Sequence, residues 1–125
     1  MSPGPVSSGA VSVIINTLDR ADALEILLDA LTRITHRRFE VVVVAGPCTD
    51  HTDEVLDRWA GAVKVLHCPE PNLSMSRNIG IAASAAEFVA FIDDDAVPEP
   101  AWLAELMAGF ADDTAPAGAL VAVLG

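Results

Sequence analysis

The stretch FVAFIDDDAVPEP, residues 88–100, places an apolar run directly against three carboxylates. Residues 88–92 are apolar throughout, which is typical of a strand buried on both faces of a parallel sheet. Asp93, Asp94 and Asp95 follow without a spacer, and Pro100 suits the first turn of a further helix. The stretch therefore predicts a buried strand with a cluster of negative charge at its carboxyl end.

The rest of the chain repeats this alternation of strand and helix. Runs rich in β-branched residues predict five strands, at 11–15, 39–44, 63–67, 88–92 and 119–124. The first intervening segment carries a helical leucine stripe, made of Leu24, Leu27, Leu28 and Leu31. Further helices are predicted over 49–61, with Thr49, Asp50 or Thr52 as its cap, over 74–86, and after Pro100. This order predicts an α/β fold with three layers, α/β/α, around a mainly parallel sheet.

The acidic triplet falls where such sheets bind ligands, at the carboxyl ends of the strands. If strand alternation persists past residue 92, Asp93 and Asp95 point to one side and Asp94 to the other. Adjacent carboxylates are best tolerated when a cation neutralises them, and Mg²⁺ or Mn²⁺ held this way can bind a diphosphate. A solvated acidic loop that caps the next helix through Asp95 or Glu99 fits the triplet equally well.

Composition limits the classes of function. The chain has 125 residues, of which 52% are hydrophobic, enough for one globular domain over residues 11–125. The net charge of −11 disfavours nucleic acid and anionic membranes as partners. No apolar run approaches the ~20 residues of a transmembrane helix. Residues 1–10 lack the pattern of a signal peptide, so we expect a flexible leader and a cytoplasmic location.

Three segments together resemble the family 2 glycosyltransferases: VSVIINTLDR at 11–20, FEVVVVAGPCTDHTDEV at 39–55, and NLSMSRNIGIAASAAEFVAFIDDDAVPEPAWL at 72–103. The resemblance covers nearly all of residues 11–110 in the family's order and spacing. It implies a GT-A fold of the Rossmann-like, nucleotide-diphospho-sugar transferase type. It also implies a nucleotide-diphosphate sugar as donor, bound by this N-terminal part, and transfer of the sugar with inversion in most members.

The resemblance assigns roles to the acidic triplet. Asp93 and Asp95 match the family's Asp-x-Asp motif, with Asp95 as the direct ligand of Mn²⁺ or Mg²⁺. Asp93 would face the ribose or a metal-bound water, and Asp94 counts among the donor-binding residues without a defined role. A Lewis-acidic ion at this position would stabilise the leaving nucleoside diphosphate.

Two further pairs of residues match the family's donor-binding pattern. Thr17 and Arg20 match the loop after the first strand, although they fit equally well as ordinary turn residues before a helix. Arg77 and Asn78 match the Arg-Asn-x-Gly stretch, in which Gly80 would allow a close helix contact. Arg77 could bond the base or the phosphates, whereas arginines on surface helices are most often solvated.

Two features depart from the family. Ala45, Gly46, Pro47 and Cys48 replace the usual Asp-Asp-Gly-Ser, in which one aspartate reads the nucleotide base, so this loop does not indicate the donor's base or sugar. The family's acceptor-binding segment, with its carboxylate general base, has no counterpart before Gly125. We therefore expect a truncated, donor-binding part, with the general base beyond Gly125 and an unknown acceptor.

Two alternatives use the same carboxylates. In a haloacid-dehalogenase-like phosphatase, Asp93 would be the nucleophile and Asp95 the general acid, but the 30 residues after Asp95 lack the lysine that this chemistry needs. A non-catalytic, receiver-like regulatory module would need an acidic pair after the first strand, where this chain reads NTLDR at 16–20. Both alternatives rank behind the transferase.

Overall fold

The computed structural model describes residues 10–112 and 121–124. Nine elements follow in the predicted order: β1 (Val11–Thr17), α1 (Ala21–Leu31), β2 (Phe39–Ala45), α2 (Thr52–Trp59), β3 (Lys64–His67), α3 (Leu73–Ala83), β4 (Phe88–Asp93), α4 (Trp102–Asp112) and β5 (Val121–Leu124). The predicted leader, except residue 10, and the start of the predicted fifth strand lie outside the described residues. No helix within the described ranges has the length and apolar character needed to cross a bilayer.

The strands form one sheet in the order β3-β2-β1-β4-β5, and every neighbouring pair is parallel. The prediction of a mainly parallel sheet is confirmed. β1 lies at the centre, and its residues from Val11 to Ile15 are all buried, as expected for a strand covered on both faces. The register places Asn16 of β1 opposite Asp93 of β4, so both strands end at one edge.

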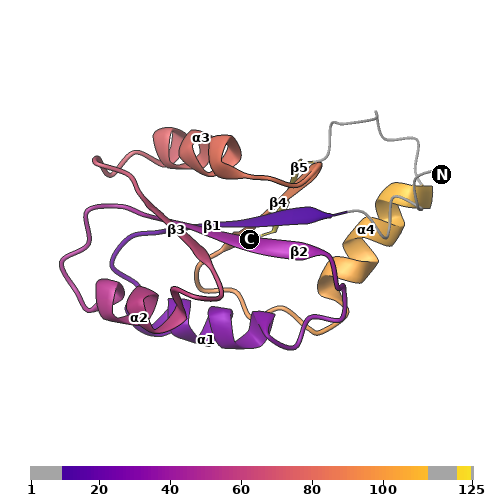
Figure 1. The fold of residues 1–125 in the computed structure, drawn as a ribbon, viewed down its shortest axis with the longest axis horizontal. Coiled ribbons are helices and arrows are strands. Elements are labelled where there is room, and N and C mark those ends of the chain that lie inside the picture. The colour runs from indigo at the N-terminus through magenta and orange to yellow at the C-terminus, as the bar shows by residue number, and fades with distance from the viewer. Residues whose placement is uncertain (1–9, 113–120, 125) are drawn as a thin grey trace.

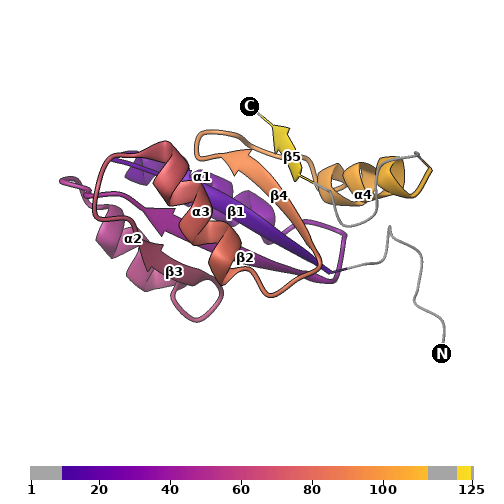
Figure 2. The same ribbon diagram turned by 90° about the horizontal axis from the view of Figure 1, so that it is seen from above.

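Helices cover both faces of the sheet, which confirms the three predicted layers. Figure 1 shows α1 and α2 on one face and α3 on the other. The leucine stripe of α1 packs with residues of β1, β2 and β4 in the larger hydrophobic core, which Leu103 and Met107 of α4 join. A smaller core lies beneath α3, which crosses the sheet in Figure 2.

Helix α3 approaches the sheet closely because its inward face carries small residues. Ser76 and Gly80 are its buried residues. A Cβ atom placed on Gly80 would lie 2.7 Å from Cγ2 of Ile14 and 3.3 Å from Cγ2 of Val44. Any residue with a side chain at position 80 would clash with the sheet, so the glycine is what permits this close contact.

The carboxylate of Glu40 joins several segments at the edge of the sheet where β1, β2 and β4 begin. Glu40 Oε2 accepts hydrogen bonds from Ser12 Oγ at 2.6 Å and from the Ala85 N–H at 2.7 Å, and Glu40 Oε1 lies 3.2 Å from Lys64 Nζ. Burial by itself raises the pKa of Glu40, but these hydrogen bonds and the lysine charge outweigh it and lower the pKa overall. The ionised form of Glu40 thus fixes the turn between α3 and β4.

Replacing Glu40 with glutamine should lower the free energy of unfolding by about 1 kcal/mol at pH 7. Because the folded-state pKa lies below the ordinary value, this stability is present above pH 4.5 and is lost as the pH falls through the folded-state pKa. Urea unfolding of both proteins across this pH range measures the difference. A difference in free energy of unfolding that stays constant down to low pH would contradict a stabilising role for the ionised form of Glu40. The substitution Glu87→Gln, at an exposed position, serves as the control.

Candidate functional site

A cleft of about 480 Å³ opens where the carboxyl ends of the strands meet. Its walls come from the segments that follow β1, β2, β3 and β4, which a parallel sheet brings to one edge. The lining residues are Asn16, Thr17, Leu18, Arg20, Gly46, Glu70, Pro71, Asn72, Leu73, Ser76, Asp93, Asp94 and Asp95. The predicted residues Thr17, Arg20, Asp93, Asp94 and Asp95 therefore lie together.

All three carboxylates of the triplet line this cleft. The sequence placed Asp94 on the opposite side from its neighbours only if strand alternation continued past residue 92, and it does not continue, because β4 ends at Asp93 and residues 94 and 95 form a turn. The Ala96 N–H donates to the Asp93 carbonyl at 3.1 Å and closes that turn. Strand alternation therefore stops before it can separate the carboxylates.

Asp94 is the most enclosed member of the triplet, with 12% of its side chain exposed. Burial raises the pKa of its carboxyl group, and a hydrogen bond from Thr17 Oγ1 at 2.9 Å and the charge of Arg20 oppose that rise. The neighbouring charges of Asp95 and Asp93 raise the pKa further. A cation at this end of the cleft would relieve the cost of keeping Asp94 ionised.

Arg20 supplies positive charge at the triplet. Its Nη1 donates to Asp95 Oδ2 at 3.0 Å and lies 3.8 Å from Asp94 Oδ1. Arg20 stands at the N-cap position of α1, directly after the loop that follows β1. Among the described residues that line the cleft, Arg20 is the one cationic side chain.

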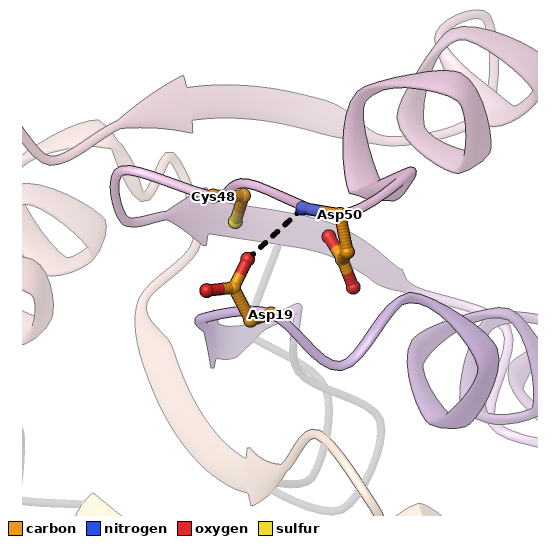
Figure 3. Close-up of side chains that lie close together, drawn as sticks. All are labelled: Asp19, Cys48 and Asp50. Atoms are coloured by element: carbon orange, nitrogen blue, oxygen red, sulfur yellow. Dashed lines mark hydrogen bonds between the residues drawn. The ribbon is translucent and has the colours of Figure 1, made fainter.

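Two aspartates brace the loops that follow β1 and β2, and Figure 3 shows the Asp19 carboxylate directed at the backbone N–H of Asp50. Asp19 adopts a left-handed backbone conformation, with φ of 53°, and its carboxylate accepts the N–H groups of Thr49 and Asp50 at 2.6 and 3.2 Å. Asp50 in turn accepts the N–H groups of Ala21 at 3.1 Å and Thr52 at 3.0 Å. The pKa of Asp50 is lowered, chiefly by the Thr52 hydroxyl group.

The predicted cap of α2 is confirmed in part. His51 occupies the N-cap position and makes no capping hydrogen bond through its side chain, whereas Asp50, one of the predicted candidates, accepts the N–H of Thr52, the first residue of the helix. Ligand atoms of Asp19, Cys48 and Asp50 lie within 4.8 Å of one another. Because both carboxylates accept backbone N–H groups, loop bracing explains this cluster without a bound ion.

Arg77 and Asn78, which the sequence predicts to bind the donor, lie on α3 and do not line the cleft within the described part of the chain. The guanidinium carbon of Arg77 sits 5.7 Å from the ring centroid of Phe91. Its Nε atom is buried and has no hydrogen-bond partner among the described residues. Their neighbour Ser76 does reach the cleft, where its hydroxyl group accepts a hydrogen bond from Asn16 Nδ2 at 2.6 Å.

One wall of the cleft, formed by residues 70–73 where the chain passes from β3 into α3, was not predicted from the sequence. A hydrogen bond of 2.8 Å from the Cys68 N–H to the Ala45 carbonyl ties this segment to the end of β2. Asn72 caps α3 by accepting from the Met75 N–H at 3.0 Å, and an asparagine before a helical pattern is the signal that could have located this turn. Leu73 remains 54% exposed and offers an apolar surface to the cleft.

The triplet has the chemistry of a divalent metal site. Hard ions such as Mn²⁺ and Mg²⁺ take carboxylate oxygens as ligands. Three carboxylates share one end of the cleft, and an arginine already pairs with two of them. The residues present therefore fit the ion that the sequence predicts.

Three comparisons relate this geometry to known proteins. Over 115 residues the chain is 33% identical to the pre-mycofactocin glycosyltransferase of Mycobacterium tuberculosis, covering 90% of this chain and 23% of that protein. The mannosyltransferase PcManGT of Pyrobaculum calidifontis, solved with GDP-Man and Mn²⁺, is 29% identical with a TM-score of 0.79, over 89% of this chain and 35% of that one. Residues 1–349 of Staphylococcus aureus TarS with UDP-GlcNAc are 28% identical with a TM-score of 0.71, over 82% and 31%.

The architecture shared with the solved structures is the GT-A fold, as the sequence predicts. The chain spans about a quarter to a third of the length of the curated relatives it matches. These likenesses favour neither the phosphatase nor the receiver-like module. Residues 12–123 match the family described as glycosyl transferase family 2. The chain therefore belongs to glycosyl transferase family 2.

Proposed function

We propose that this chain is the donor-binding part of a metal-dependent glycosyltransferase that uses a nucleoside-diphosphate sugar. The observation that carries the proposal is the gathering of Asp93, Asp94 and Asp95 with Arg20 at one end of the cleft. Solved family relatives with GDP-Man and Mn²⁺ or with UDP-GlcNAc support this class of donor. Inversion at the sugar carbon is the expected outcome for such a family member.

Electrostatics explain why the proposed donor needs an ion. The cleft lining holds four carboxylates, those of Asp93, Asp94, Asp95 and Glu70, and one guanidinium group, that of Arg20. Two like charges about 4 Å apart repel by ~1 kcal/mol in water and ~4 kcal/mol near a protein surface. A bare diphosphate would therefore be repelled, so its binding requires added positive charge.

Each residue then has a proposed part in donor binding. Asp95 and Asp93 hold the divalent ion, and the hydroxyl group of Thr17 keeps Asp94 in place beside them. The bound ion would supply Lewis-acid stabilisation of the charge that develops on the leaving diphosphate. Leu18 and Leu73, exposed by 41% and 54%, offer apolar surface to the nucleoside. Arg77 and Asn78 stay a prediction, since their donor role rests on the motif alone.

Calorimetric titration of the 125-residue chain with UDP or GDP tests this function. We expect binding in Mn²⁺, and in Mg²⁺ to a lesser or equal extent, with no measurable binding in EDTA, because the acidic cleft repels the uncompensated diphosphate. Nucleotide binding that is equal with and without a divalent ion would contradict the proposal. Covalent labelling of Asp93 by acetyl phosphate would instead support the phosphatase or receiver-like alternative.

A further inference from the structure

The side chain of Arg20 stands where a cation for the triplet is needed. Its Nη1 lies 3.0 Å from Asp95 Oδ2 and 3.8 Å from Asp94 Oδ1. Arg20 and Asp95 are both 55% exposed, so their pairing is reached from open solvent. The guanidinium group therefore screens the carboxylates in the same place that the proposed metal site requires.

A guanidinium group and a divalent ion cannot share Asp95 without cost. Both are positive, and each uses the carboxylate oxygens as acceptors or ligands. The loop that carries Arg20 is fixed at its backbone, because Asp19 accepts the N–H groups of Thr49 and Asp50 from the next loop. The exposed side chain is thus the part of Arg20 that can move.

We propose that Arg20 is an exchange residue: it pairs with Asp95 in the ligand-free protein and transfers to the diphosphate of the donor when the divalent ion binds. This inference rests on the proposed function. The planar fork of arginine matches a phosphate as well as a carboxylate, so the same side chain can serve both partners. Arg20 therefore opposes the ion when no nucleotide is present and favours it when the nucleotide arrives.

The exchange makes ion and nucleotide binding mutually dependent. An ion that binds alone displaces Arg20 from Asp95 and leaves its guanidinium group with only the more distant Asp94 as an anionic partner. A nucleotide that binds with the ion offers a new anionic partner to that group. By linkage, the factor by which nucleotide tightens ion binding equals the factor by which the ion tightens nucleotide binding. Arg20 is accordingly a donor-binding residue whose contact with the diphosphate depends on the bound ion.

The test compares the wild-type chain with Arg20→Ala by electron paramagnetic resonance of free Mn²⁺, first without nucleotide and then with saturating UDP or GDP. For Mn²⁺ alone, Arg20→Ala should bind up to about fivefold more tightly, because removal of an exposed competing charge has effects of this size. The factor by which saturating nucleotide increases the affinity for Mn²⁺ should fall by at least about fivefold in this variant. Tighter binding of Mn²⁺ alone together with a smaller nucleotide effect distinguishes exchange from a merely structural role.

Two further variants serve as controls. Arg20→Lys keeps the charge without the fork, so it should bind Mn²⁺ alone like the wild type and retain part of the nucleotide effect. Arg33→Ala removes a similarly exposed arginine, which pairs with Asp29 at 2.9 Å on α1, and should leave both measurements unchanged. Thermal unfolding of every variant checks that the fold is kept.

The outcomes separate this inference from the proposed function. Weaker binding of Mn²⁺ alone by Arg20→Ala, or an unchanged nucleotide effect, overturns the exchange while metal-dependent nucleotide binding by the wild type still upholds the donor site. A wild-type chain that binds no Mn²⁺ even with UDP or GDP overturns the proposed function, and the exchange falls with it.

Discussion

Mn²⁺-supported binding of UDP or GDP should fall by at least about a hundredfold when Asp95 is replaced by alanine. Residues that merely orient metal ligands already contribute about ten- to a hundredfold to metal affinity, so loss of a direct ligand should cost at least as much. Arg20 would also lose its carboxylate at 3.0 Å and remain near Asp94 alone. Calorimetry with Mn²⁺ and nucleotide measures the loss.

The same substitution should leave the fold intact. Asp95 is 55% exposed and its ion pair with Arg20 faces solvent, and such pairs contribute about 0–1 kcal/mol. The melting temperature should therefore stay close to that of the wild type. Asp57→Ala removes an exposed carboxylate on α2, away from the cleft, and should change neither property. Undiminished metal-dependent binding by Asp95→Ala would refute the role given to this residue.

Replacing Gly80 with leucine should cost about 3 kcal/mol of stability or more. The first side-chain atom would already lie 2.7 Å from Cγ2 of Ile14, which is fully buried, so the clash cannot be relieved by moving into solvent. Helix α3 must then shift away from the sheet, and it carries the cleft residues Leu73 and Ser76 with it. Nucleotide binding should weaken along with the free energy of unfolding measured in urea.

Gly109 offers a matched control with the opposite sign. It also lies inside a helix, α4, but a Cβ atom there would meet nothing within 4 Å. Gly109→Ala should therefore raise stability by about 0.5–1 kcal/mol, because alanine loses less backbone entropy in a helix. Equal effects of the two substitutions would show that the contact of α3 with the sheet is looser than its geometry indicates.

The sequence predicted which elements form better than where they end. The β-branched runs locate all five strands, yet β1 continues to Thr17 because Asn16 and Thr17 still pair with Asp93 and Ala45 of the neighbouring strands. The third helix ends at Ala83 rather than at residue 86. The residues predicted to end this helix lie outside it because they make tertiary contacts: the Ala85 N–H donates a hydrogen bond to Glu40, and the Ala86 N–H donates one to Ser12.

The last described helix shows the same limit. Pro100 was predicted to stand in its first turn, but α4 begins at Trp102, and the Pro100 carbonyl accepts the Thr35 N–H at 2.9 Å from the loop after α1. A distant partner thus fixes the residue that a local pattern assigns to the helix. Such contacts cannot be read from nearby sequence.

The candidate site was predictable where it depends on topology. Parallel strands bring their carboxyl ends to one edge, so Thr17 and the triplet were expected at the same edge, and the pairing of β1 with β4 makes them neighbours. The ion pair of Arg20 with Asp95 joins residues 75 positions apart in the sequence, and its geometry depends on the conformations of the two loops that carry them. Glu70 and Leu73 were missed because an isolated glutamate in a loop and a leucine at the first position of a helix carry no recognisable pattern. The placement of Arg77 against Phe91, outside the cleft lining, likewise needed the structure.

The two sides of the cleft come from different pairs of strands. The β1 and β4 segments supply the aspartates and Arg20, whereas the β2 and β3 segments supply Gly46 and residues 70–73. Backbone hydrogen bonds, from Gly46 N–H to the Thr17 carbonyl and from Cys68 N–H to the Ala45 carbonyl, join these segments whatever side chains they carry. Under the proposed function, side chains along the β2 and β3 rim can therefore vary during evolution while the backbone bonds that hold the cleft together, and the aspartates and Arg20 on the other side of it, stay unchanged.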